Sequence, residues 1–346
     1  MSVTPLCVES DDMDDGASVY SEDELQTLDI GPNMTYFIVE SDIEGKYEIE
    51  DLVHAEINPT SSPSDVTFYY YSKKNPDTGI KVNTDNLDPL KNSDFTASKE
   101  TRFLIHGWKN SYTSDINVFI KKAIFQEYDA NVFVVDWSPI ASRNYVSARW
   151  AVNDVGKYVA DFLRALESTF SVDLTSVSIV GHSLGAHVSG LAGNDLNGIV
   201  NQVIGMDPAL PLFSLSDEDN RLAKKDAQFV HVIHTNGGKL GFTAALGHVD
   251  FYPNGGSSQP GCGFDFTGAC AHSRAYIYYA ESVAPIQKSF VSKQCTSYKD
   301  YSNGQCDSNP MANMGGYVAD IGARGLYYLN TNKESPFAQV QKNRKG

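Results

Sequence analysis

Short apolar runs alternate with helical segments along most of the chain. The most apolar runs, 103–106 and 132–136, predict buried strands, and apolar residues at helical spacing predict a helix over 115–127 between them. A longer helix is predicted over 145–169, with its apolar positions at Trp150, Val155, Val159, Phe162 and Leu166. Further strands are predicted at 66–71, 176–180, 202–206, 229–234 and 248–252, and the polar stretch 72–98 is predicted to be rich in loops. Strands that alternate with helices indicate the α/β class, with a mostly parallel sheet covered on both faces.

The acidic residues gather at the start of the chain. Residues 1–51 hold fifteen Asp or Glu and a single lysine, a net charge of −14 out of −16 for the whole chain. We therefore expect an acidic, partly disordered segment over 1–64 and one catalytic α/β domain over 65–346. The nearly neutral main domain argues against nucleic acid as a partner. No apolar run approaches the roughly 18 residues that a membrane-spanning helix needs.

Four of the five cysteines lie late in the chain, and only Cys7 lies far upstream. Two close pairs predict two short disulfides and an oxidising compartment, whereas reduced cytosolic cysteines are the alternative. Neither pair has the spacing of a zinc site. Asn33 begins a glycosylation sequon, which fits secretion. Residues 1–7 lack the basic start and apolar core of a signal peptide, so the expectation is a secreted protein whose signal has been removed.

The sequence Gly181-His182-Ser183-Leu184-Gly185 follows a predicted strand and precedes a small-residue stretch. A serine between two glycines at a strand-to-helix turn is typical of the nucleophile elbow of an α/β-hydrolase. Such a turn holds the hydroxyl out at a helix N-terminus, at the edge of the sheet.

A serine nucleophile needs an imidazole base, and that base needs a carboxylate partner. In this fold the acid and the histidine follow the serine in that order. Asp207 ends the strand 202–206 and is the predicted acid, and His272 lies on a loop that can face the elbow. The other histidines after Asp207 lie within or at the start of predicted strands and are interpreted as structural; they are His231, His234 and His248.

The tetrahedral intermediate needs two backbone N–H donors. One is the residue after the nucleophile, Leu184, and the other comes from the loop after an early strand. His106-Gly107-Trp108 occupies that loop, so Trp108 is the second predicted donor.

The chain resembles the animal pancreatic-type lipases and their relatives, the insect phospholipases A1. Colinear matching segments lie at 101–108, 135–138, 181–187, 205–209, 230–235, 247–256 and 270–276. The resemblance implies an α/β-hydrolase fold, a catalytic triad of Ser183, Asp207 and His272, and oxyanion donors at Trp108 and Leu184. It also implies the disulfides Cys262–Cys270, which closes a lid, and Cys295–Cys306, and it leaves Cys7 without an obvious partner.

Two loops are shorter than in the classical triacylglycerol lipases of this family. The lid between Cys262 and Cys270 has seven residues, 263–269, and the second loop has eleven, 236–246. Short loops are typical of phospholipase A1 and galactolipase members. An open rim lets a polar headgroup stay hydrated, and Phe264 and Phe266 would touch the lipid interface. We therefore predict a lipid esterase specific for the sn-1 ester of phospholipids or galactolipids, with triacylglycerol lipase activity as the alternative.

The resemblance also bears on metals and partners. Some family members hold a calcium ion at positions that fall on Glu218, the Arg221 carbonyl, Ala223 and Asp226. Ala223 replaces a carboxylate there, so no metal and no other cofactor is predicted. The chain stops near where a C-terminal β-sandwich would begin, so we expect no colipase-type partner. We also expect a monomer that acts on lipid at a membrane or micelle interface. A non-catalytic yolk or storage protein is the alternative of another class, although all three triad residues are present.

Overall fold

The computed structural model describes residues 19–21, 34–41, 44–58, 60–283 and 290–339. Cys7 and Asn33 lie outside the described residues. The chain divides into two units, 1–53 and 54–346, so that residues 54–64 belong to the second unit. In the first unit β1 (Val19–Tyr20), β2 (Tyr36–Glu40) and β3 (Tyr47–Asp51) form an antiparallel sheet in the order β1-β3-β2. No strand was predicted there, because the short apolar run that forms β2 lies among many acidic residues.

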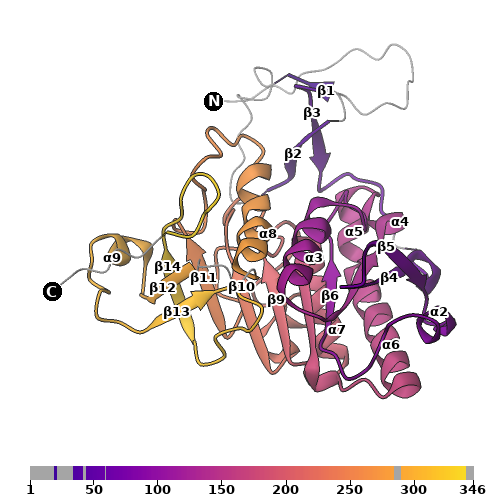
Figure 1. Cartoon of the computed structure of the whole chain (residues 1–346). Helices are drawn as coiled ribbons and strands as arrows, with labels where there is room; N and C mark the ends of the chain where they lie inside the picture. Colours follow the sequence, from indigo (N-terminus) through magenta and orange to yellow (C-terminus); the bar gives the residue numbers. More distant parts are fainter. Residues whose placement is uncertain (1–18, 22–33, 42–43, 59, 284–289, 340–346) are drawn as a thin grey trace, which may run out of the picture. The chain divides into compact units, whose positions relative to one another are not determined.

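The second unit is built on an eleven-stranded sheet in the order β13-β12-β14-β11-β10-β9-β8-β6-β7-β4-β5 (Figure 1). Its strands are β4 (Thr67–Ser72), β5 (Asn75–Val82), β6 (Thr101–Ile105), β7 (Asn131–Asp136), β8 (Val177–His182), β9 (Gln202–Met206), β10 (Phe229–Ile233), β11 (Val249–Pro253), β12 (Phe290–Gln294), β13 (Met311–Met314) and β14 (Gly325–Leu329). The run from β14 to β7 is parallel, and β4, β5, β12 and β13 are antiparallel at the two edges. The predicted mostly parallel sheet is confirmed.

Helices cover both faces of this sheet. They are α2 (Asp88–Lys91), α3 (Asp115–Glu127), α4 (Ser138–Ala141), α5 (Tyr145–Trp150), α6 (Val152–Phe170), α7 (Leu184–Asp195), α8 (Ala269–Val283) and α9 (Tyr298–Ser302). Helices α3 and α8 pack side by side and share a core with Leu104 of β6 (Figure 1). The neighbouring strand residue, Phe103, packs instead on Phe162 of α6, which contacts α7. Because successive strand residues point to opposite faces, the two helix pairs lie on opposite sides.

The predicted helix over 145–169 is two helices. α5 ends and α6 begins at Ala151, whose backbone has φ −81° and ψ −7°. Trp150 lies just before this break and is 59% exposed, so the prediction that it shares the apolar face is wrong. The other four predicted apolar positions belong to α6 and are fully buried. At about 100° per residue, Trp150 lies on the side of a helix opposite to Val159, nine residues later, so it points away from the core.

Two regions hold strands that the apolar pattern did not predict. The polar stretch 72–98 contains β5, an edge strand with many exposed positions, together with α2. Residues 290–329 contain β12, β13 and β14. β5 and β13 are the outermost strands; β5 carries few apolar residues and β13 has only 4 residues, so that their sequences resemble loops. β12 and β14 lie inside the sheet, and β14 does carry an apolar run.

The turn between β8 and α7 brings two backbones into contact. A Cβ atom built on Gly185 would lie 2.3 Å from the Ile105 carbonyl oxygen and 2.4 Å from that of His106. Only glycine therefore allows α7 to approach the end of β6.

We predict that Gly185→Ala lowers the free energy of unfolding by about 3 kcal/mol, because the added methyl group overlaps backbone that cannot move aside. Chemical denaturation measures this change. Gly322→Ala is the matched control, because its Cβ would meet nothing nearer than the Asp320 carboxylate at 3.7 Å. Equal stability of the two variants would contradict the argument.

Candidate active site

Ser183 occupies the turn between β8 and α7. Its backbone has φ 58° and ψ −125°, a conformation that residues other than glycine rarely adopt. The Ser183 amide donates to the Met206 carbonyl at 3.0 Å, and the Ser183 carbonyl accepts from the Ala209 amide at 3.4 Å. These two bonds tie the strained serine to the carboxyl end of β9, where Asp207 lies.

The Asp207 carboxylate is fully buried and accepts three hydrogen bonds. One of its oxygens, Oδ2, accepts from Nδ1 of His272 at 2.5 Å. The other, Oδ1, accepts from the backbone amides of Thr235 at 2.7 Å and Asn236 at 3.0 Å. These two amides could not be predicted from the sequence, since every residue except proline carries a backbone N–H donor. They fix the carboxylate plane and therefore the orientation of the His272 ring.

His182 connects the elbow to His272. The two imidazole rings lie 4.4 Å apart, and Nε2 of His182 lies 3.0 Å from the His272 carbonyl oxygen. Burial, and then the nearby His272, lower the pKa of His182 well below its usual value. A neutral His182 that contacts a carbonyl must carry its proton on Nε2, so it donates to His272.

The structure thus brings His272 and Asp207 into direct contact. Ser183 is connected to them through neighbouring residues, because its amide binds the Met206 carbonyl and His182 contacts His272. Among the described residues, no hydrogen bond joins the Ser183 hydroxyl to the His272 ring. Such bonds are often long before substrate binds. The relay from serine to imidazole therefore stays a prediction.

The three other late histidines have partners of their own. His234 contacts the Phe242 carbonyl at 2.7 Å through Nδ1 and Asp250 at 2.9 Å through Nε2. His231 accepts from the amide of Gly315 at 3.3 Å, and His248 accepts from the amide of Val230 at 2.9 Å. None of these contacts involves Ser183 or Asp207.

The predicted oxyanion donors follow two residues that lie against each other. A Cβ atom on Gly107 would lie 2.9 Å from Cβ of Ser183, so the loop after β6 contacts the elbow. The Trp108 indole donates to the Arg143 carbonyl at 2.7 Å, which fixes the loop beyond Gly107. Leu184 is the first residue of α7. The roles of the two amides stay predictions.

The loop between Cys262 and Cys270 is closed by the predicted disulfide, with a Cα–Cα distance of 5.6 Å. The second predicted disulfide, Cys295–Cys306, is also present. Phe264 is 78% exposed, and its ring stacks on that of Phe266 at 6.3 Å.

Asp265, which the sequence analysis missed, holds this loop against α8. Its carboxylate accepts from the backbone amides of Cys270 at 3.2 Å and Ala271 at 2.7 Å, in the first turn of the helix that carries His272. A carboxylate just before a helix is a capping signal that could have been found. Lys239 donates to the Asp265 carbonyl at 2.9 Å and so links the two short loops.

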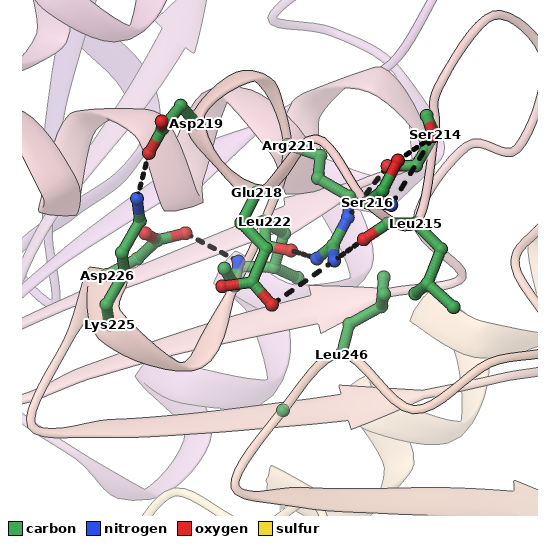
Figure 2. A network of polar contacts seen from close by, with 12 residues as sticks. Ser214, Leu215, Ser216, Glu218, Asp219, Arg221, Leu222, Lys225, Asp226 and Leu246 are labelled. Atoms are coloured by element: carbon green, nitrogen blue, oxygen red, sulfur yellow. Dashed lines mark hydrogen bonds and ion pairs between the residues drawn. The ribbon is translucent and has the colours of Figure 1, made fainter.

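The positions that hold calcium in some family members do not fit a cation here. Figure 2 shows Arg221 at their centre, where its guanidinium donates to the carbonyls of Ser214 and Leu222 and lies 3.6 Å from the exposed carboxylate of Glu218. Ala223 offers only a methyl group, and its amide donates to Asp226 Oδ2 at 2.7 Å. One buried carboxylate beside a guanidinium falls short of the six or more oxygen ligands that calcium requires.

Asp226 carries a second feature of this region. Its Oδ1 is buried without a hydrogen-bond partner among the described residues, and burial raises the pKa of Asp226 to about 7. In the unfolded chain the carboxyl titrates near its usual pKa of 3.8. The folded state therefore binds the proton more tightly, and the stability that this contributes is lost as the pH rises towards and through about 7.

We predict that wild-type stability falls by roughly 4 kcal/mol relative to Asp226→Asn between pH 4 and pH 8, since one pKa unit corresponds to about 1.4 kcal/mol. Denaturant unfolding across this range measures the difference. Calcium should leave Tm unchanged at every pH. A rise in Tm with calcium that Asp226→Asn abolishes would contradict this account.

We further predict that Gly241→Ala lowers kcat/KM for ester hydrolysis about a hundredfold while the chain still folds. Its Cβ would lie 2.5 Å from both Asp207 carboxylate oxygens, so the carboxylate and His272 must shift. Steady-state kinetics and circular dichroism test the two parts. Ala245→Ser, on the same loop, is the control. Unchanged kcat/KM in Gly241→Ala would show that Asp207 does not set the catalytic geometry.

Comparisons with known proteins identify the family of the chain. The family model named Lipase matches residues 37–337. Pancreatic triacylglycerol lipases of Cavia porcellus and Homo sapiens are 33% identical over 308 and 312 residues, and pancreatic lipase-related protein 2 of Bos taurus is 32% identical over 308. Each match covers 80% of this chain and 66% of the relative, so the chain spans just under two thirds of their length.

Among solved structures, mouse alpha/beta hydrolase domain-containing protein 10 is 15% identical over 52% of this chain and 77% of its own, with a TM-score of 0.31. The fold assignment rests instead on the strand order, the turn at Ser183 and the family match over most of the chain. The protein belongs to the lipase family and has the α/β-hydrolase fold.

Proposed function

We propose that this chain is a secreted serine esterase that hydrolyses the sn-1 ester bond of phospholipids or galactolipids. Two disulfides in the second unit support an oxidising compartment. No helix among the described residues is long and apolar enough to cross a membrane.

In the first step the Ser183 hydroxyl attacks the ester carbonyl carbon while His272 takes the hydroxyl proton on Nε2. The imidazolium that forms is stabilised by Asp207, which holds Nδ1 at 2.5 Å. The carbonyl oxygen becomes an oxyanion and accepts from the amides of Trp108 and Leu184. When the carbonyl forms again, the bond to the leaving alcohol breaks, and His272 gives its proton to that alcohol. The product is an acyl-enzyme on Ser183.

Water completes the cycle. His272 takes a proton from a water molecule, whose oxygen attacks the acyl-enzyme, and a second oxyanion forms at the same two amides. Collapse of this intermediate breaks the bond to Ser183, and His272 returns the proton to the serine oxygen. The fatty acid leaves, and the free enzyme is restored.

The short lid is the observation that carries the substrate proposal. The seven residues 263–269 are closed by a disulfide and fixed by Asp265, so they form a compact loop. Such a loop adds little apolar wall, and a polar headgroup beside the site keeps its water. Phe264, at 78% exposure, supplies an apolar contact to the lipid instead.

Triacylglycerol hydrolysis is the second candidate. It is favoured by the pancreatic triacylglycerol lipases among the relatives. A storage protein on the same fold is the third, but the contact between Asp207 and His272 at 2.5 Å, beside a strained serine, supports catalysis. A protein that only binds lipid has no need of either.

We predict that Ser183→Ala abolishes ester hydrolysis and leaves Tm unchanged, because the hydroxyl is the nucleophile. Phospholipid, galactolipid and triacylglycerol are each supplied at an interface, and released fatty acid and its position are measured. We expect the two polar lipids to be cleaved at sn-1 and to be preferred over triacylglycerol. Ser168→Ala, an exposed serine of α6, is the control.

A serine-reactive phosphonate identifies the nucleophile independently of the substrate. Labelling of Ser183 with preferred cleavage of triacylglycerol would move the specificity to the second candidate. Absence of both labelling and hydrolysis would favour the storage protein.

A further inference from the structure

Three large apolar side chains stand out on the surface near the end of α5. Trp150 is 59% exposed, Leu215 is 51% exposed and Leu212 is 43% exposed. The Arg149 guanidinium connects Trp150 with Leu212, because its Nε donates to the Leu212 carbonyl at 3.1 Å and it lies 5.7 Å from the Trp150 ring. Leu215 follows Leu212 on the same loop, where Arg221 binds its carbonyl. We call Trp150, Leu212 and Leu215 the apolar patch.

The backbone that presents this patch is strained and held in place. Leu212 has φ 61°, a left-handed conformation that leucine rarely adopts. Two buried arginines fix the carbonyls around it. Arg149 binds the Leu212 carbonyl. Arg221 binds the carbonyls of Ser214 and Leu215 (Figure 2). A strained residue persists only where its surroundings hold it, and such residues gather at functional sites.

The apolar patch lies at the carboxyl ends of the parallel strands, where the catalytic residues also lie. α5 follows the carboxyl end of β7, and the loop with Leu212 and Leu215 follows that of β9, directly after Asp207. The two segments meet where the Tyr145 hydroxyl donates to the Pro211 carbonyl at 3.0 Å. The same tyrosine packs edge-on against Trp108, at 5.4 Å.

We propose that the apolar patch docks onto the surface of a lipid aggregate, together with Phe264 of the lid. This rests on the proposed function, because a lipid ester must reach Ser183 at these strand ends. β8, which carries the elbow, lies between β7 and β11 in the sheet, and the lid follows β11. Apolar side chains therefore stand on both sides of the serine in the strand order.

The absence of charge on the side chains of the apolar patch indicates which kind of lipid surface it would bind. The patch side chains are uncharged. The two arginines beside them are buried and bind backbone carbonyls, and Arg221 also lies near the Glu218 carboxylate. The attraction is then apolar and does not depend on anionic headgroups. Zwitterionic phosphatidylcholine vesicles are the appropriate probe, and binding to them should change little with salt.

The test uses the full chain with Ser183→Ala, so that vesicles stay intact, and measures partitioning onto phosphatidylcholine vesicles. Adding Trp150→Ser with Leu215→Ser should weaken partitioning by about tenfold or more, since two apolar contacts are lost. Val318→Ser with Ile321→Ser is the matched control. These residues are 79% and 66% exposed and precede the amino end of β14, at the opposite edge. The control should change partitioning by less than about twofold.

A second measurement separates this proposal from the proposed function. With Ser183 restored, the patch variant should lose hydrolysis of phosphatidylcholine vesicles in proportion to its binding and keep turnover of a soluble short-chain ester. If the patch variant partitions as strongly as the parent protein, or no more weakly than the control variant, the docking proposal is wrong. The proposed function does not fail with it, because hydrolysis is measured separately.

If the wild-type chain hydrolyses no ester but the Ser183→Ala protein still partitions through the patch, the proposed function fails and the docking surface stands. Analytical ultracentrifugation completes the test. A wild-type dimer that the patch variant dissociates would assign the patch to a second copy of the chain and overturn the lipid proposal.

Discussion

One buried carboxylate organises the catalytic edge of this protein. Asp207 is shielded from water, and an ionised carboxylate without water needs hydrogen-bond donors on both oxygens. The three donors come from distant parts of the chain, the amides of Thr235 and Asn236 after β10 and the His272 ring on α8. The pairing of β9 with β10 and the path of the chain beyond β11 must both be correct for these donors to meet. The orientation of the His272 ring therefore follows from the hydrogen bonds that the buried Asp207 carboxylate requires.

Neutral histidines brace this edge without adding charge to it. Burial holds the pKa of His182 well below its usual value and lowers that of His187 to about 3. Each imidazole then offers one donor. His182 donates to the His272 carbonyl, and His187 donates to that of Ala209 at 2.8 Å and accepts from the Leu222 amide at 3.0 Å. A permanent cation beside His272 would oppose its protonation during catalysis, and the neutral ring avoids this.

Much of this arrangement could be predicted because its signals are local. The central strands and α3 follow from apolar runs and spacing, and Asp207 and His272 follow from the order of residues in the chain. What the sequence did not show depends on distant contacts. The break at Ala151 and the edge strand β5 have no apolar signature, and the clamp by Arg149 becomes visible only when the loop after β9 lies against α5. The positive φ of Leu212 could not be predicted either, since leucine has no preference for that conformation.

The short loops and the rigid backbone of the apolar patch are related. A long lid can cover apolar surface around a lipid site and uncover it when substrate arrives, so its rim has no need to be rigid in water. Here the lid is closed by a disulfide over seven residues, and apolar side chains outside it stay exposed. Exposed apolar side chains tend to collapse onto the protein, and resisting this requires backbone that cannot relax. The Arg149 and Arg221 guanidiniums supply that resistance, because they bind the backbone carbonyls of the loop that carries Leu212 and Leu215.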